Sequence, residues 1–532
     1  MKTLYTLLIV ICLVAVFSFN AAAQVTGDYR SNTTVGGAWS AASSWQTYDG
    51  SSWVTATQAP TGSEVITIKS GDSVYVDGLV TISDTLKNQG KMGGTTNLTF
   101  ANGGVYNHAE INGSIPTGLW ETGSTCMITG YVNGSKPNNA NQNFYNFVWD
   151  CSGQTANVDL SMTGNTLGGD FSVIRSGASN RIYITSPGNY LSGPVTINGN
   201  LYQTGGQFAT NGSGSSTTNG DTITLYVNGN IVVTAGIFSV SRGSAPDAKI
   251  YVNGDVSITN ATVQNSGGFH VNKLIFAKAG TQNLTLSNVA YGGGSSYFTM
   301  QVESGTTLNM GTSVIGSSNT GSFILLDGAT LETGHPDGIT GCIQCTGTSN
   351  GGGNILSTAA NYIFNGSAAQ VTSVSLPTTV NNLTINNASG VLHSQSTLIN
   401  GVLDLKAGEF DNTIPFTLGP SGSIAYNGGT LKISVGVDDP DNAVPTQFFV
   451  NQNYPNPFNP ATTITYGLNK SSNVVVKIYN MLGQQVAVFS LGQQNPGVHT
   501  MNYNASNLST GQYIYCVHAD NQVISNRMLV VK

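Results

Sequence analysis

The chain has 532 residues, a net charge of −7 and only 8% charged residues, with 39% hydrophobic residues and 66 glycines. It has no cluster of lysine or arginine that could neutralise phosphates, which argues against a nucleic-acid partner. Because the apolar residues lie in alternating runs, the composition favours a folded, nearly all-β protein of two to four domains over a disordered one.

The first 23 residues have the features of a secretory signal peptide. Lys2 supplies a positive charge, Leu7–Phe19 is an apolar stretch, and Ala21 and Ala23 are small residues before a predicted cleavage site at Gln24. The apolar stretch is short for a bilayer span, and no later stretch approaches about eighteen apolar residues. We therefore expect an exported mature chain without a transmembrane segment.

Residues 24–100 are predicted to form a tryptophan-rich β region, because Trp39, Trp45 and Trp53 lie close together there. Exposed indoles form platforms for sugar rings. A solenoid, however, also needs bulky residues to cover its first coil, so we favour a cap and keep the glycan platform as the alternative. The region resembles the start of G8-type exported β domains through Gly37–Trp39, Trp53, Pro60, Val65–Ile68, Gly71 and Val74–Val76.

Residues 101–435 are predicted to be a repetitive β-solenoid-like region. Two apolar or β-branched residues, Asn or Asp, and Gly recur before alternating apolar residues, with a first example at Tyr75. Copies that begin at Thr196, Tyr226 and Tyr251 are 30 and 25 residues apart, close to one coil of a parallel solenoid. We expect about 13 coils over roughly 60–65 Å, with Asn-Gly at positive-φ corners. Since Asn-Gly is also a hairpin signal, tandem β-sandwiches remain the alternative.

No catalytic, metal or cofactor site is predicted. The sequence contains no GxSxG, HExxH, P-loop or EF-hand pattern. Enzymes built on β-helices need acids close together, or acids beside a basic residue. The candidates do not recur in this way; they are Glu110, Glu121, Asp159, Asp170, Arg175, Arg181, Asp221, Asp255, Glu303, Asp327, Glu332 and Asp337. A polysaccharide lyase or glycosidase remains an alternative only.

Five cysteines follow the signal peptide, and export permits disulfides. Cys126 and Cys151 are separated by about the length of one predicted coil, so on adjacent coils they could form a disulfide; two separate buried thiols are the alternative. Cys342 and Cys345 lack the further ligands of a zinc site and the strand-to-helix context of a redox motif. They are predicted to form a local disulfide or a pair of buried thiols.

Residues 436–444 are a predicted linker, because acids and a proline interrupt the β pattern there. Residues 445–532 are predicted to form an Ig-like β-sandwich. The prolines of 453–460 fix φ and remove donors, which favours an extended edge segment. Six short alternating runs follow at intervals of about ten residues, over 462–468, 474–479, 485–491, 499–504, 512–518 and 523–531.

This last region resembles the type A C-terminal sorting domain of the type IX secretion system of Bacteroidetes and their relatives. The matching segments are QNYPNPFNPATTI from Gln452, IYNMLGQQV from Ile478, Gly497–His499, Leu508–Tyr513 and Arg527–Lys532. A departure is Cys516, where an apolar residue is usual. The motif residues are Asn453, Tyr454, Pro455, Asn456, Pro457, Phe458, Asn459, Pro460, Gly483, Gly511, Tyr513 and Lys532.

The resemblance implies export across the outer membrane by the type IX machinery, proteolytic removal of the domain, and either attachment to the cell surface or release. With the neutral polar composition, it predicts a secreted or cell-surface, non-enzymatic adhesin or structural protein. The alternative is a carbohydrate-binding or polysaccharide-degrading β-helix protein. Surface glycans or extracellular polysaccharide are the expected partners of the passenger, besides the secretion machinery.

Overall fold

The computed structural model describes residues 24–132, 136–185, 193–212, 222–242, 247–265, 272–292, 298–316, 321–345, 353–432, 445 and 447–532. The predicted signal peptide before Gln24 and the predicted linker 436–444 lie outside these residues. Contacts divide the chain into one unit that ends at Leu431 and a second that begins at Lys432.

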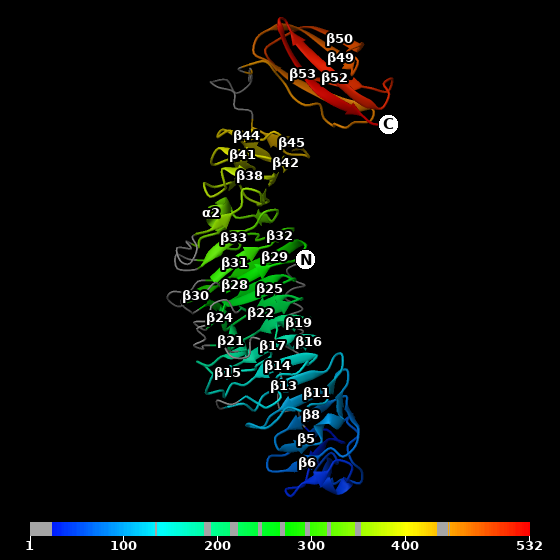
Figure 1. Cartoon of the computed structure of the whole chain (residues 1–532), viewed down its shortest axis with the longest axis vertical. Coiled ribbons are helices and arrows are strands. Elements are labelled where there is room, and N and C mark those ends of the chain that lie inside the picture. The colour runs from blue at the N-terminus through cyan, green and yellow to red at the C-terminus, as the bar shows by residue number, and fades with distance from the viewer. Residues whose placement is uncertain are drawn as a thin grey trace. The chain divides into compact units, whose positions relative to one another are not determined.

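The first unit is a parallel β-solenoid, which confirms the predicted fold class and rules out tandem sandwiches for this part of the chain (Figure 1). Many of its strands are short runs that bury every second side chain, as in Ile66–Ile68, whereas Thr125–Ile128 and Gln207–Asn211 are buried on both faces. The longest stack consists of β5 (Ile66–Ile68), β8 (Thr85–Asn88), β11 (Val105–His108), β13 (Thr125–Ile128), β14 (Asn146–Asp150), β17 (Phe171–Arg175), β20 (Leu201–Gln203), β23 (Ile231–Val233), β26 (Val256–Thr259), β29 (Gly280–Ser287), β32 (Thr306–Asn309), β34 (Thr330–Thr333), β36 (Asn361–Phe364), β39 (Leu383–Asn386), β42 (Val402–Ala407) and β45 (Ser423–Tyr426).

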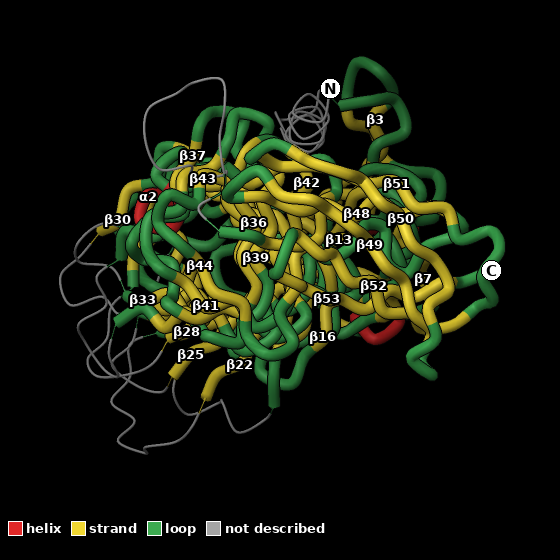
Figure 2. The backbone as a smooth tube through the Cα atoms, turned by 90° about the horizontal axis from the view of Figure 1, so that it is seen from above, coloured by secondary structure: helices red, strands yellow, loops and turns green. Residues whose placement is uncertain are grey.

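Two further parallel stacks form the other faces of the middle coils. The larger contains β16 (Thr166–Leu167), β19 (Val195–Ile197), β22 (Thr222–Val227), β25 (Asp247–Val252), β28 (Asn272–Phe276), β31 (Phe298–Val302), β33 (Ser322–Leu325) and β35 (Ile355–Leu356). The smaller contains β15 (Val158–Asp159), β18 (Ile182–Thr185), β21 (Gln207–Asn211), β24 (Ile237–Ser241), β27 (Thr262–Gln264) and β30 (Ala290–Gly292). Figure 2 shows these strands in yellow, joined by green loops.

Shorter parallel sheets complete both ends of the solenoid. Near the N-terminal end they are β2 (Gly37–Ala38), β6 (Ser73–Tyr75) and β9 (Lys91–Gly93), and β7 (Val80–Ile82), β10 (Leu98–Phe100) and β12 (Leu119–Trp120), with the 3-10 turn η2 (Thr95–Asn97). Near the C-terminal end they are β37 (Gln370–Val371), β40 (Val391–Leu392), β43 (Glu409–Asp411) and β46 (Thr430–Leu431), and β38 (Thr379–Val380), β41 (Thr397–Ile399) and β44 (Phe416–Leu418).

The coils differ in length, contrary to the predicted near-constant spacing. Leu86 pairs in register with Tyr106, whereas Leu331 pairs with Tyr362. The coil that begins at Leu331 is therefore about half as long again as the coil that begins at Leu86. Successive coils already stack in parallel at β5 and β8, well before residue 101, the predicted start of the repetitive region. The predicted spacing does hold in the middle coils, where Thr196 pairs with Tyr226 and Tyr226 pairs with Tyr251.

Stacked aromatic side chains form the centre of the solenoid. The ring centroids of Phe147 and Phe171 are 5.4 Å apart, those of Phe171 and Phe208 are 5.9 Å apart, and those of Phe208 and Phe238 are 5.8 Å apart. All four side chains are fully buried. Because each ring contacts the next, the core is continuous from coil to coil. Burial of each side chain stabilises the fold by roughly 1.5–3 kcal/mol.

The Asn-Gly motifs at Asn198, Asn228 and Asn253 are in the solenoid corners, but the predicted reason for their glycines is wrong. Gly199, Gly229 and Gly254 do not have positive φ. They stack backbone on backbone instead: a Cβ on Gly229 would lie 2.5 Å from the carbonyl oxygen of Gly199, and a Cβ on Gly254 would lie 2.3 Å from that of Gly229. Glycine is therefore required by the close approach of successive coils.

The asparagines of the same motifs form a ladder along the outside. The Asn228 amide donates to Asn198 Oδ1 at 2.9 Å, and the Asn253 amide donates to Asn228 Oδ1 at 3.0 Å. A second ladder uses side-chain oxygens to accept backbone N–H groups one coil further on; it runs through Asn146, Asp170, Asn200, Asn230, Asp255 and Asn283. Amide side chains, with Asp170 and Asp255, thus join successive coils through hydrogen bonds.

An antiparallel cap precedes the first coil. Its strands are β1 (Tyr29–Ser31), β3 (Trp45–Tyr48) and β4 (Trp53–Thr55), with the 3-10 turn η1 (Ala42–Ser44) before β3. β1 pairs antiparallel with β3 on one side and parallel with β5 on the other. The cap therefore occupies the edge that the first coil would otherwise expose.

The second unit is an antiparallel sandwich, as predicted. One sheet contains β47 (Phe449–Val450), β48 (Ala461–Leu468) and β51 (Gly497–Asn504). The other contains β50 (Gln485–Gln494), β49 (Ser472–Asn480), β52 (Gly511–Ala519) and β53 (Gln522–Val530). Alternate residues such as Val474, Val476 and Ile478 face a common core, while their neighbours face outward.

Candidate functional site

The Asn-Pro segment of the second unit, residues 453–460, is held by a buried polar cluster around Asn453. The Asn453 N–H donates to the Tyr515 hydroxyl at 2.8 Å, and that hydroxyl donates to the Asn451 carbonyl at 2.7 Å. The Asn453 amide donates to Thr462 Oγ1 at 2.9 Å. Because Asn453 is 1% exposed, these bonds are shielded from water and fix the start of the segment.

The rest of the segment lies between the edges of the two sheets, consistent with the predicted edge position. The carbonyl of Pro455 accepts from Thr462 Oγ1, and Asn456 Oδ1 accepts from the Leu529 N–H. The buried Phe458 pairs with Val530, and the carbonyl of Pro460 accepts from the Ala505 N–H. The segment therefore connects β48 with β53. Within the segment, the side chains of Tyr454, Pro457 and Asn459 are exposed.

The remaining motif residues lie at turns and at the chain end. Gly483 has a φ of +78°, so glycine suits the turn between β49 and β50. Gly511 begins β52, and the Tyr513 hydroxyl donates to the Ser509 carbonyl at 3.0 Å. Lys532 Nζ donates to the Ser506 carbonyl at 2.7 Å. These residues fasten loops of the sandwich rather than form a reactive site.

Replacing Tyr515 by phenylalanine is expected to loosen the Asn453 cluster. The change leaves the buried Asn453 N–H without its acceptor and removes one of the two donors to the Asn451 carbonyl, and it should cost about 1–3 kcal/mol locally. Amide hydrogen exchange of the peptide around Asn453, measured by mass spectrometry on the full chain, should become faster. Tyr479→Phe is the control, because its side chain lies on the outward face of β49; equal exchange in both variants would contradict the assigned role.

The structure buries two of the three tryptophans that were considered for a glycan platform. Trp39 is 3% exposed and Trp45 is fully buried, with the rings 5.0 Å apart in an edge-to-face arrangement. Their indole N–H groups donate to the carbonyls of Pro60 and Trp39. Trp53 is half-buried and lies against the Arg30 guanidinium, 4.5 Å from the ring centroid. A three-indole platform is therefore wrong, since capping contacts occupy these rings.

The five cysteines among the described residues are free thiols, so the disulfide alternatives are wrong. Cys126 pairs in register with Phe147 of the next coil, and Cys151 lies beyond Phe147, roughly 13 Å further along the strand direction. Cys342, which ends the short helix α2 (Gly338–Cys342), and Cys345 are buried thiols; burial raises their pKa values to about 12 and about 11.

Four of the candidate acids and arginines, Arg175, Asp170, Asp255 and Glu332, have structural partners, and Asp221 lies outside the described residues. Arg175 binds Asp150 with two hydrogen bonds of 2.5 and 2.8 Å. Asp170 and Asp255 belong to the ladder described above, and Glu332 accepts from the Asn365 amide at 2.5 Å. Among the described residues, no group of three His, Cys, Asp or Glu side chains is placed to hold a metal ion.

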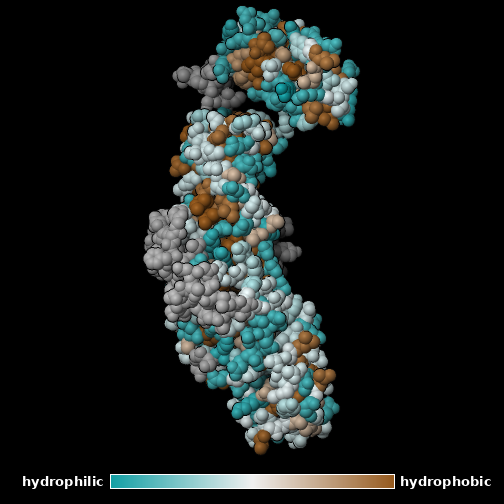
Figure 3. All heavy atoms as spheres, in the orientation of Figure 1, coloured by the Kyte–Doolittle hydropathy of each residue, from teal (hydrophilic) through white to brown (hydrophobic). Residues whose placement is uncertain are grey.

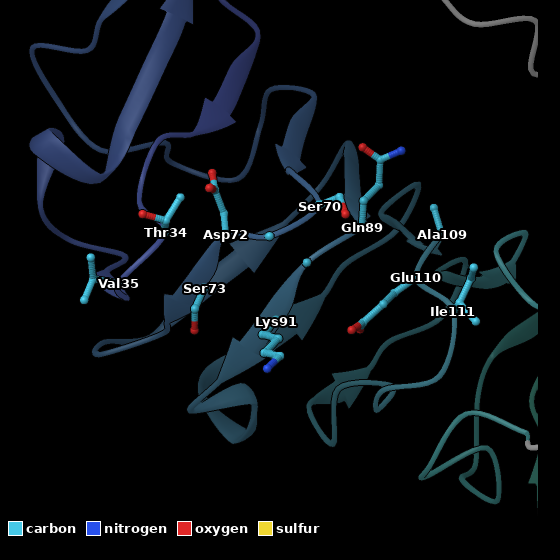
Figure 4. A pocket seen from close by; sticks show the side chains of 12 residues that line it. Thr34, Val35, Ser70, Asp72, Ser73, Gln89, Lys91, Ala109, Glu110 and Ile111 are labelled. Carbon is cyan, nitrogen blue, oxygen red and sulfur yellow. The ribbon is translucent and has the colours of Figure 1, made fainter.

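A cleft of about 600 Å³ lies beside the cap and was not predicted. Three stacked turns line it, around Gly71, Gly90 and Glu110, together with the cap loop at Thr34 and Val35. Gly90 allows the turns to nest, because a Cβ there would lie 2.4 Å from the Lys69 carbonyl oxygen. Figure 4 shows Glu110 extending toward the side of the cleft on which Lys91 lies.

The charges of the cleft are distributed unevenly. Asp72, which is 4% exposed, accepts from Ser31 Oγ at 2.5 Å and lies 3.7 Å from Lys69 Nζ. Burial raises the pKa of Glu110, and the positive charge of Lys91 partly offsets this effect. Asp72 is therefore a structural anchor, whereas Lys91 and Glu110 are available to a ligand.

The comparisons with known proteins concern the second unit. Residues 452–532 match the family model of the secretion system C-terminal sorting domain. No curated protein and no solved structure matches the chain. The protein therefore carries a type IX secretion sorting domain on a passenger for which these comparisons found no relative.

The sorting domain makes this a secreted or cell-surface protein that interacts with the type IX secretion machinery. Within the part of the chain that the structure describes, no helix is long and apolar enough to cross a membrane.

Proposed function

We propose that the solenoid is a non-enzymatic adhesive or structural rod, which the sorting domain delivers to the cell surface or the medium. The observation that carries this proposal is the continuous series of parallel pairings from β5 to β45, with one offset along β29. Such a stack repeats similar outward faces along one direction. Repetition converts many weak contacts into firm attachment, because each further contact is made at high effective concentration.

The surface chemistry supports the same proposal. White and teal residues cover most of the visible solenoid face in Figure 3, with smaller brown patches between them. The exposed ladders of amide side chains offer donors and acceptors with little net charge. Hydroxyl-rich or amide-rich surfaces, such as glycans and other proteins, are suitable partners for them.

Incubation of residues 24–532 with soluble and insoluble polysaccharides tests this proposal. Pull-down and release of reducing or unsaturated ends are measured in the same samples. Binding without release, or neither binding nor release, is expected of an adhesive or structural rod. Release of products would overturn the non-enzymatic proposal and direct attention to the acids of the solenoid.

A further inference from the structure

The cleft beside the cap has the form of a discrete ligand site. Its volume of about 600 Å³ falls within the range of small-molecule sites. Turns from three successive coils and the cap loop line it, so its shape depends on contacts among residues distant in sequence. β6 and β9 place Ser73 directly beside Lys91, and the following coil supplies Glu110.

Two opposite charges in this cleft lack ion-pair partners. Within the described ranges, neither Lys91 nor Glu110 has an oppositely charged atom within salt-bridge distance. Space for the carboxylate is provided by Gly113, where a Cβ would lie 2.2 Å from Glu110 Oε2. An ammonium without a partner favours an anionic ligand group, and a carboxylate favours hydroxyl donors.

Apolar side chains lie at opposite ends of the cleft. Val35 is 97% exposed and Ile111 is 52% exposed. Figure 4 places them on either side of Ser73, Lys91 and Glu110. They can cover the C–H face of a sugar ring whose polar groups meet the charged side chains.

We propose that this cleft binds a uronic acid residue of an acidic polysaccharide. The sugar carboxylate pairs with the Lys91 ammonium, and ring hydroxyls donate to the Glu110 carboxylate and bond with the Ser73 hydroxyl. Ile111 or Val35 packs against the ring. The inference extends the proposed adhesive role, on which it rests, by giving the rod one specific contact near its capped end.

Isothermal titration calorimetry of residues 24–532 with tetragalacturonate tests the inference. Binding is expected for the wild type, and Lys91→Ala should weaken it by roughly tenfold, because one charge-assisted contact is lost. Glu110→Gln should weaken it by a smaller factor, since the amide retains an acceptor. The matched controls are Lys87→Ala and Glu121→Gln, which lie outside the cleft and should bind like the wild type.

Two comparison ligands define the chemistry. Cellotetraose, a neutral tetrasaccharide, and tetraglutamate, an acidic peptide, should bind at least roughly tenfold more weakly than tetragalacturonate. Absence of tetragalacturonate binding up to about 10 mM, equal affinity for either comparison ligand, or unchanged affinity in Lys91→Ala would overturn the inference. Such a failure leaves the adhesive rod open, because pull-down of whole polysaccharides tests the other faces independently.

Discussion

Replacing Gly229 by alanine is expected to lower the free energy of unfolding of the solenoid by about 2–4 kcal/mol. The added Cβ would lie 2.5 Å from the Gly199 carbonyl oxygen and 2.6 Å from its carbon, and both are backbone atoms that cannot turn aside. Relief requires the coils to separate locally, which weakens the neighbouring ladder of Asn198 and Asn228. Urea unfolding followed by far-ultraviolet circular dichroism measures the loss.

Gly78→Ala is the matched control. Gly78 follows Asp77 in the same sequence motif, but it has open space around its Cβ position and no positive φ. Its replacement should change the free energy of unfolding by less than about 0.5 kcal/mol. Equal effects of the two substitutions would contradict the close-approach explanation and restore a purely conformational role for the motif.

Acidification is expected to destabilise the solenoid through His108. The imidazole is fully buried, with its nitrogens at 3.0 Å from the Tyr106 hydroxyl and 3.1 Å from the Asn112 carbonyl oxygen. Burial lowers its pKa from 6.5 to about 4. Below pH 6.5 His108 becomes protonated in the unfolded chain, whereas in the folded chain it stays neutral until about pH 4. Stability is therefore retained above pH 6.5 and falls by about 3 kcal/mol toward pH 4.

Tryptophan fluorescence during urea unfolding can follow this change, because all five tryptophans lie between Trp39 and Trp149, in the cap and the coils of the first unit. His108→Gln should be less stable than the wild type at pH 7 but should lose less stability between pH 7 and pH 4. His393, also buried and with a lowered pKa, should retain a smaller pH dependence in that variant. An unchanged pH slope in His108→Gln would refute the assignment to His108.

The fold class could be predicted because strand alternation and turn residues are local properties. The Asn-Gly motifs at Asn198, Asn228 and Asn253 marked three successive corners correctly. Their physical role could not be predicted, since it depends on which backbone atoms lie above and below. An Asn-Gly pair is compatible with either a hairpin turn or a solenoid corner. Glycine is required at these corners because the backbone of the adjacent coil leaves no room for a Cβ atom.

Spacing along the chain was a poor guide to contacts between coils. Cys126 and Cys151 are one predicted coil length apart, yet Cys126 meets Phe147, because that coil is shorter than the predicted one. A disulfide prediction from spacing requires a constant coil length, and insertions in the corners alter this length without changing the core. The burial of Trp39 and Trp45, in contrast, follows from the need to cover the first coil.

The cleft was missed because it is formed by turns in which no single residue carries a catalytic motif. A regular step does connect Ile66, Leu86 and Tyr106, which pair in register on successive coils. Recognition of that step would have aligned the turns at Gly71, Gly90 and Glu110 as neighbours. The cap loop at Val35 could not be deduced in this way, because it connects β1 with β2 before the regular step begins.

The stacking of the coils has a mechanical consequence. The hydrogen bonds between β-strands run along the solenoid axis, so tension along that axis loads them one coil at a time rather than all together. A detached coil such as the one from Leu86 to Tyr106 exchanges about 4.8 Å of stacked height for roughly 70 Å of extended chain. Under flow, the solenoid would lengthen stepwise and dissipate work at each step, while the coils that remain stacked keep their surfaces intact.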